Sequence, residues 1–150
     1  MKKIFLDTNF IGDLFVERKD ENNPEKAIKL KLDAQNLLAE CKSRGYSLFI
    51  TYLTLANINY LSRSQSKEEK KRLLEVLCRL FNLIDNTKKQ VYQALRIDGQ
   101  DFEDTLQYVA AKESGCDVII TRDTKGFSIS DIPVYSPSEF MEVIGKLDTD

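Results

Sequence analysis

Lys2-Lys3-Ile4-Phe5-Leu6-Asp7-Thr8-Asn9 opens the chain, and this stretch decides how the rest of it is organised. A short apolar run ends abruptly at Asp7, and an apolar-periodic segment follows it. This pattern predicts a buried parallel strand that leads into a helix. Ligands of open α/β sheets bind outside the carboxyl ends of the strands, so Asp7 is placed where chemistry usually occurs. The alternative is that Asp7 or Asn9 only caps the helix.

The remaining sequence alternates short apolar runs with segments of helical periodicity. Helices are expected to begin near residues 8, 24, 51, 66, 87, 101 and 136, and residues 17–23 to form a loop. The expected strands are 4–6, 48–50, 83–84, 118–120 and 133–135. Such alternation predicts a parallel sheet covered by helices on both faces, in a single domain over residues 1–150.

Several predicted helix starts carry capping residues. Thr8 or Asn9 is expected to cap the first helix, and Ser66 with Glu69 three residues later forms a capping-box pattern. Ser136 precedes Pro137, which suits the first position of a C-terminal helix.

The composition indicates a globular protein that works in the cytoplasm. Of the 150 residues, 42% are hydrophobic and 31% charged, and no apolar run has the length of a membrane span. The N-terminus lacks the apolar region of a signal peptide, so no membrane partner is expected. The three cysteines have no metal-ligand spacing and are expected to be reduced and buried.

The chain contains no histidine. This excludes Ser-His and Cys-His nucleophilic machinery and the usual zinc ligands, so acid–base or metal chemistry must rest on carboxylates. The net charge of −2 excludes a generally basic nucleic-acid coat but permits a local basic rim.

Three acids fall at equivalent places in the predicted fold. Asp7 ends the first strand, Asp123 follows the strand at 118–120, and Asp104 lies in the first turn of the helix before that strand. All three can converge at one rim, where their mutual repulsion favours a bound divalent cation. Mg²⁺ or Mn²⁺ prefers such oxygen ligands and can orient water for phosphodiester hydrolysis.

Each acid also has a structural interpretation. Asp101 suits the N-cap of a helix in which Asp104 is the third residue, and Asp123 suits the cap of a turn over 124–126. Glu103 is expected to be a surface residue favoured by the helix dipole. Spacing alone leaves the metal site and these caps about equally supported.

Three segments in order resemble PIN domains, the ribonuclease domains typified by VapC toxins of bacterial toxin–antitoxin pairs. They are Leu6-Asp7-Thr8-Asn9, Asp101-Phe102-Glu103-Asp104-Thr105-Leu106-Gln107, and Ile119 through Phe127 with Thr121-Arg122-Asp123 at its centre. The segment from Pro133 to Phe140 is similar to the usual family ending. The resemblance covers essentially the whole chain.

The resemblance implies a Rossmann-like three-layer α/β/α sandwich and Mg²⁺- or Mn²⁺-dependent hydrolysis of RNA. The family's acids match Asp7, Asp104 and Asp123, which are the expected catalytic and metal-binding residues. One departure is clear: where the family usually has a glutamate after its second strand, this chain has Asn57. Residues expected to support the site are Asn9, Asn57, Asp101 and Thr121.

The leading hypothesis is therefore a metal-dependent endoribonuclease toxin, inhibited by an antitoxin and expected to form a homodimer. The alternative from Asn57 is a PIN-like module that binds RNA or protein and cleaves poorly. A phosphoacceptor receiver domain, with Asp85 as acceptor, ranks last because it leaves Asp104 and Asp123 without a role. Arg63, Arg122 and Lys125 are candidates for contacting RNA, whereas Lys67 is more simply an ordinary surface residue.

Overall fold

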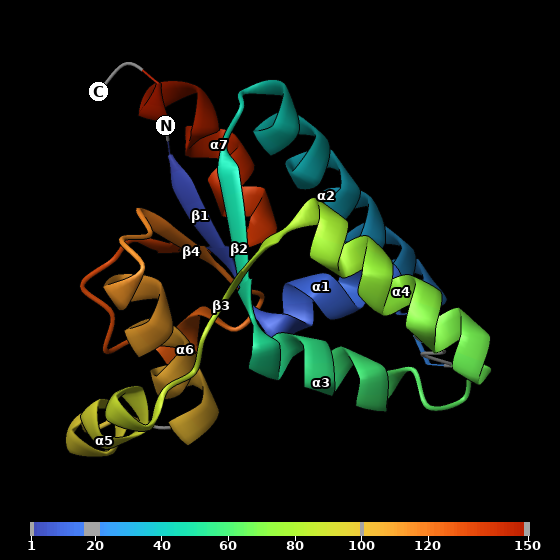
Figure 1. Cartoon of the computed structure of the whole chain (residues 1–150). Helices are drawn as coiled ribbons and strands as arrows, with labels where there is room; N and C mark the ends of the chain where they lie inside the picture. Colours follow the sequence, from blue (N-terminus) through green and yellow to red (C-terminus); the bar gives the residue numbers. More distant parts are fainter. Residues whose placement is uncertain (1, 17–21, 100, 149–150) are drawn as a thin grey trace.

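The computed structural model describes residues 2–16, 22–99 and 101–148 (Figure 1). Within these ranges a five-stranded parallel sheet has the order β3-β2-β1-β4-β5. All five predicted strands are present. Their bounds are β1 Lys3–Leu6, β2 Ser47–Thr51, β3 Asn82–Ile84, β4 Val118–Ile120 and β5 Val134–Tyr135.

The helices begin within about one residue of the predicted positions. They are α1 Thr8–Phe15, α2 Pro24–Ser43, α3 Tyr52–Leu61, α4 Lys67–Leu80, α5 Lys88–Arg96, α6 Phe102–Glu113 and α7 Pro137–Leu147. A short 3₁₀ turn, η1, spans Thr124–Phe127, where the sequence indicated only a turn. Of the predicted loop at 17–23, residues 17–21 lie outside the described residues.

Alternate residues of β1 face two separate cores, which gives the fold its three layers. Ile4 and Leu6 pack with side chains of α1, α2, α4 and α7, whereas Phe5 packs with side chains of α5 and α6. This alternation is the period-two side-chain pattern of a strand buried on both faces. The predicted α/β/α sandwich is confirmed (Figure 1).

The order of the strands places its reversal point beside Asp7. From central β1 the chain builds β2 and β3 on one side and then crosses to β4 and β5 on the other. Phe5 is paired with Phe49 of β2 and with Ile119 of β4. Crevices for ligands form where the strand order reverses in this way. Asp85 follows β3 at the sheet's edge, which disfavours the receiver-domain hypothesis.

Six helices begin with a side chain that accepts a backbone N–H, as the sequence suggested for several of them. These caps are Asn23, Thr51, Ser66, Thr87, Asp101 and Ser136. Helix α1 is different, because Asp7 occupies its N-cap position without a side-chain capping bond. The expectation that Thr8 or Asn9 caps this helix is wrong, since the helix already begins at Thr8.

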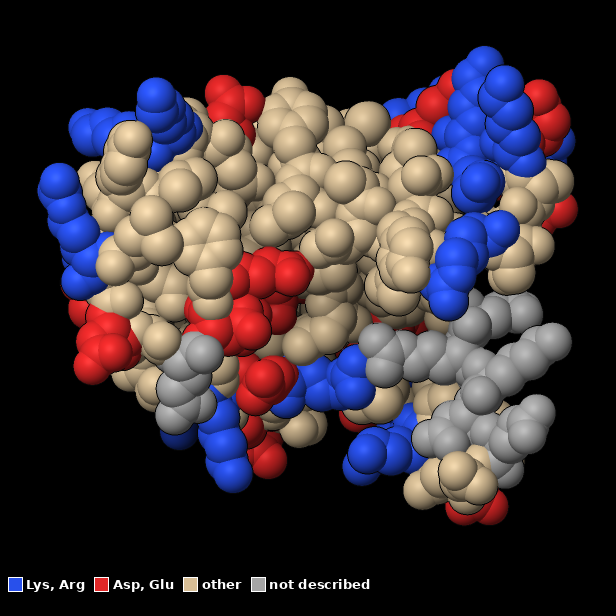
Figure 2. Space-filling model, turned by 90° about the horizontal axis from the view of Figure 1, so that it is seen from below, with Lys and Arg blue, Asp and Glu red and all other residues tan. Residues whose placement is uncertain are grey.

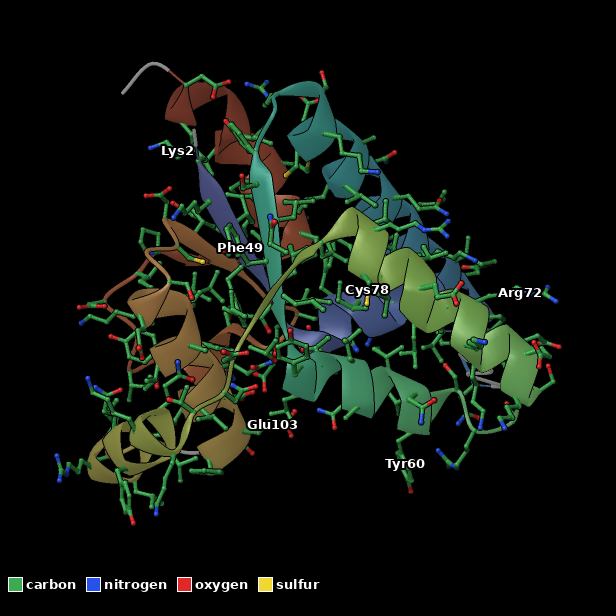
Figure 3. All side chains as sticks on the ribbon, in the orientation of Figure 1. Lys2, Phe49, Tyr60, Arg72, Cys78 and Glu103 are labelled. Atoms are coloured by element: carbon green, nitrogen blue, oxygen red, sulfur yellow. The ribbon has the colours of Figure 1, made fainter. Side chains whose placement is uncertain are left out.

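All three cysteines are free, and Cys41 and Cys116 are buried as predicted. Cys78 is exposed, contrary to the prediction, because it follows the buried Leu77 on α4 and lies on another side of that helix (Figure 3). No helix in the described part of the chain has the length and apolar character needed to cross a membrane.

Candidate active site

Asp7 lies at the carboxyl end of β1 and is 5% exposed. Its backbone N–H donates to Ile120 O at 3.0 Å, which fixes it beside β4. The Thr121 hydroxyl donates to Asp7 Oδ2 at 2.9 Å and accepts the Asp123 backbone N–H at 3.1 Å. One hydroxyl therefore connects two of the predicted acidic residues.

Asn9 holds the loop after β4 against the start of α1. Its Nδ2 donates to Thr121 Oγ1 at 3.2 Å, and its Oδ1 accepts the Arg122 backbone N–H at 3.1 Å. The structure thus places Asn9 and Thr121 where they orient the side chain of Asp7 and the backbone that carries Asp123.

Asp104 and Asp123 approach each other across Gly126. A methyl group on Gly126 would lie 2.1 Å from Asp104 Oδ2 and 3.3 Å from Asp123 Oδ2. Asp123 occupies the N-cap position of η1 but makes no side-chain capping bond. Asp101 does cap α6, accepting the Asp104 backbone N–H at 3.0 Å. Of the capping interpretations, only the one for Asp101 is realised.

Two carboxylates at this edge, those of Asp7 and Asp104, have raised pKa values. Burial, followed by the charges of Glu103 and Asp123, raises the pKa of Asp7 to about 6, against the lowering effect of the Thr121 hydrogen bond. Burial and then the charge of Asp7 raise the pKa of Asp104 to about 7. Repulsion from neighbouring carboxylates is the cause that the two groups share beyond burial.

A network of buried polar side chains lies next to this carboxyl edge of the sheet. The Thr51 hydroxyl donates to Gln107 Oε1 at 2.8 Å, and Gln107 Nε2 donates to Thr54 Oγ1 at 3.1 Å. Thr54 Oγ1 also lies 2.9 Å from Thr8 Oγ1. Thr51, Thr54 and Gln107 are fully buried, so these bonds join α1, α3 and α6 where water is excluded.

Asn57 and Glu103 meet between α3 and α6. Asn57 Nδ2 donates to Glu103 Oε1 at 2.8 Å, and Figure 3 shows Glu103 between the ribbons of these two helices. Glu103 is exposed in the first turn of α6, as predicted, and its charge also contributes to raising the pKa values of Asp7 and Asp104. We call Asp7, Asp101, Glu103, Asp104 and Asp123 the acidic rim. Acidic side chains gather left of centre in the view from below (Figure 2).

The three basic residues predicted to contact RNA have different surroundings. Arg122 Nε lies 2.9 Å from Oδ2 of the buried Asp13, so its charge is engaged inside the fold. Arg63 follows the C-terminal end of α3, and its guanidinium lies 4.7 Å from the centre of the Tyr60 ring. Lys125 is exposed on η1, next to Gly126.

The acidic rim offers the donor chemistry that Mg²⁺ and Mn²⁺ prefer, because all its side-chain ligands are carboxylate oxygens. Among the described residues, no three acidic or cysteine side chains stand in a ligating arrangement. The fit of the rim to a divalent ion therefore rests on its donor type, on the raised pKa values and on the approach of Asp104 and Asp123 at Gly126.

Comparison with known families and proteins identifies the family of the chain. The PIN domain family model matches residues 3–125 of the chain. A curated relative, Ribonuclease VapC1 of Aquifex aeolicus (strain VF5), is 31% identical over an alignment of 149 positions. The alignment covers 94% of this chain and 94% of that protein.

Solved structures show the same fold at low sequence identity. FitAcB from Neisseria gonorrhoeae has a TM-score of 0.62 at 19% identity, over 90% of this chain and 98% of that one. VapBC2 from Rickettsia felis, bound to a DNA fragment from its promoter, has a TM-score of 0.60 at 17% identity, over 89% and 98%.

Proposed function

The chain belongs to the PIN domain family, and on that premise we propose that it is a toxin endoribonuclease that hydrolyses RNA at its acidic rim. The relative of 31% identity is named as a ribonuclease, and it matches this chain along 94% of both lengths. The absence of histidine leaves carboxylates to perform the chemistry.

The observation that supports the proposal is the location of Asp7, Asp104 and Asp123 at one edge of the sheet, where Thr121 links Asp7 to Asp123 and Gly126 lies beside both Asp104 and Asp123. They come from β1, α6 and the segment after β4, and the first two have raised pKa values. Burial and then the charges of neighbouring carboxylates disfavour ionisation of both groups, and a bound cation would relieve this cost. Asp7 and Asp123 also stand at helix starts without capping them, which leaves both carboxylates available.

We infer that Asp7, Asp104 and Asp123 hold Mg²⁺ or Mn²⁺. Such an ion would orient a water and neutralise charge on the phosphodiester. Thr121 and Asn9 keep Asp7 and the Asp123 backbone in place, and Asp101 fixes the first turn of α6 that presents Asp104.

We also propose an antitoxin partner and a homodimer. Proteins of the same fold include a toxin–antitoxin complex from Klebsiella pneumoniae and VapBC2 from Rickettsia felis. On this chain Tyr52, Tyr60 and Leu61 of α3 are 51%, 65% and 42% exposed, an apolar surface suited to self-association. A short reading frame beside the gene would support the antitoxin.

A second candidate function is an RNA- or protein-binding PIN module with little catalytic activity. Asn57 favours it, because a carboxamide brings no negative charge to a cation site. The pairing of Asn57 with Glu103 opposes it, since a carboxylate still stands at that position between α3 and α6.

The deciding experiment is RNA cleavage by the purified protein with Mn²⁺, with Mg²⁺ and with EDTA. We expect cleavage only with metal, and its loss in Asp7→Asn without loss of the folded circular dichroism spectrum. Asp85→Asn is the matched control, because Asp85 is an exposed acid at the sheet's edge and its loss should leave cleavage unchanged. Absence of cleavage with either metal would favour the binding module.

A further inference from the structure

The outward face of α5 combines positive charge with an aromatic ring. Lys88, Lys89, Tyr92, Gln93 and Arg96 recur at helical spacing on one side, whereas Gln90 and Ala94 are buried on the other. Tyr92 is 54% exposed, although an aromatic side chain of this size usually buries more of its surface.

This face borders a groove between α5 and α6. A hollow of about 480 Å³ has Lys89, Arg96 and Lys112 on its walls and Ile97 and Val109 among its apolar lining. A second hollow of about 440 Å³ shares Lys89 and Arg96 and extends past Tyr92 to Lys88. The two hollows share Lys89, Gln93 and Arg96, and we call them together the α5 groove.

The α5 groove has an excess of positive charge in a chain of net charge −2. No ion pair within the described residues engages Lys88, Lys89 or Arg96, whereas Lys112 Nζ is 2.6 Å from Asp131 Oδ2. The groove's acid, Glu113, accepts a hydrogen bond from Gln90 at 3.1 Å. The groove therefore suits a polyanion.

The groove leads away from the acidic rim. Because Gln90 near the start of α5 contacts Glu113 at the end of α6, the two helices run antiparallel. Arg96 thus lies at the end of the pair where α6 begins with Asp101, Glu103 and Asp104. Lys89 lies two helical turns farther along, about 10 Å by helix geometry. In the view from below, basic side chains stand at the left margin beyond the acidic ones (Figure 2).

We propose that the α5 groove binds the backbone of single-stranded RNA on one side of the bond to be cleaved, with Tyr92 stacking on a base. This inference rests on the proposed ribonuclease function. The acidic rim repels phosphates, so the substrate needs cations beside the rim. Lysine and arginine around an exposed aromatic ring are the usual elements of sequence-tolerant single-strand binding.

Binding is measured by fluorescence anisotropy of a labelled single-stranded RNA in EDTA, where no cleavage occurs. Removing both wall cations of α5, in Lys89→Gln/Arg96→Gln, should weaken the Kd about tenfold at moderate salt. It should also reduce the slope of log K against log salt by about 1.4, from two lost phosphate contacts. Tyr92→Leu should weaken the Kd about tenfold and leave the slope unchanged, because stacking releases no counterions.

The matched control is Lys71→Gln/Arg72→Gln on α4, which removes the same two charges far from the groove (Figure 3). It should leave the Kd within about twofold of the wild type. If both double variants weaken RNA binding equally, the effect is one of net charge alone, and the proposal is overturned. So would tighter binding of duplex DNA than of single-stranded RNA.

Kinetics separate this inference from the proposed function. The groove variants should raise KM for long RNA and leave turnover at saturation unchanged, since they lie outside the acidic rim. Cleavage by the wild type together with an unchanged KM in the variants would refute the groove alone. Groove-dependent RNA binding without cleavage under any metal would refute the ribonuclease and leave the groove standing.

Discussion

Asn57 on α3 donates a hydrogen bond to Glu103 on α6 over 2.8 Å, so an amide and a carboxylate share the position between the two helices. Asn57→Glu would place two carboxylates there. We expect the metal-free melting temperature to fall through their repulsion. Mn²⁺ should bind about tenfold more tightly because of the added charge, and should reverse the destabilisation. Calorimetric titration and thermal melts with and without Mn²⁺ measure both effects.

The control exchanges the two partners, in Asn57→Glu/Glu103→Gln. This variant keeps one carboxylate and one amide at the contact, with the hydrogen bond reversed. Its melting temperature and Mn²⁺ affinity should return to near the wild-type values. If Asn57→Glu alone changes neither quantity, Asn57 does not face the proposed metal site.

The raised pKa values of Asp7 and Asp104, about 6 and about 7, predict the pH dependence of stability. Between about pH 4 and pH 7 the unfolded chain has already released these protons while the folded chain retains them, so the free energy of unfolding falls as pH rises. Asp7 accounts for on the order of 3 kcal/mol of this loss. Urea unfolding in EDTA across this range measures it, and Asp7→Asn should flatten the decline. Stability that rises with pH in this window would contradict the prediction.

Gly126→Ala tests the approach of Asp104 and Asp123. The added methyl would lie 2.1 Å from Asp104 Oδ2, so that flexible carboxylate must turn away while the backbone stays. We expect a folded protein whose Mn²⁺ affinity and cleavage fall about tenfold. Gly145→Ala is the control, because nothing lies within 4 Å of its added methyl. Equal Mn²⁺ affinity in both variants would mean that Asp104 does not bind the metal ion.

Gln107→Leu tests the buried network beneath the acidic rim. It leaves the Thr51 and Thr54 hydroxyls without the amide they contact, in a region closed to water. The expected loss is about 1–3 kcal/mol of unfolding free energy, measured by urea denaturation. An unchanged midpoint would mean that the network contributes little to stability.

The exposed apolar side chains of α3 predict a homodimer. Light scattering over a wide concentration range should give twice the chain's mass, and Tyr60→Glu should give the monomer. Ile28→Glu on α2 is the matched control, because Ile28 is similarly exposed, at 61% against 65%, on a different helix. A wild type that stays monomeric at every concentration would refute the dimer.

The fold and the placement of three acids follow from local signals. Short apolar runs that end at Leu6 and Ile120 locate Asp7 and Asp123, and the first turn of the helix before β4 locates Asp104. These signals suffice because a parallel sheet brings all its strands' carboxyl ends to one edge.

The remaining parts of the site depend on how helices approach one another, which sequence spacing does not specify. Glu103 has the same local pattern whether it faces solvent or α3, so its contact with Asn57 was not predictable. Gln107 had a weak signal of burial in the sequence, because it is a polar residue in the mostly apolar run from Leu106 to Ala111. The structure buries every residue from Thr105 to Ala111. Arg122 was expected to contact RNA, and only the tertiary structure reveals its pairing with Asp13.

The pairing of β1 with β4 also determines when the acidic rim can form during synthesis of the chain. Thr121 and Asp7 are 114 positions apart, and the hydroxyl that orients the first acid is among the later residues to leave the ribosome. A nascent chain ending before β4 lacks both Asp123 and the strand that pairs with β1 and bonds the backbone of Asp7. Translation of most of the message therefore yields no assembled acidic rim, which forms only when β4 pairs with β1 late in synthesis.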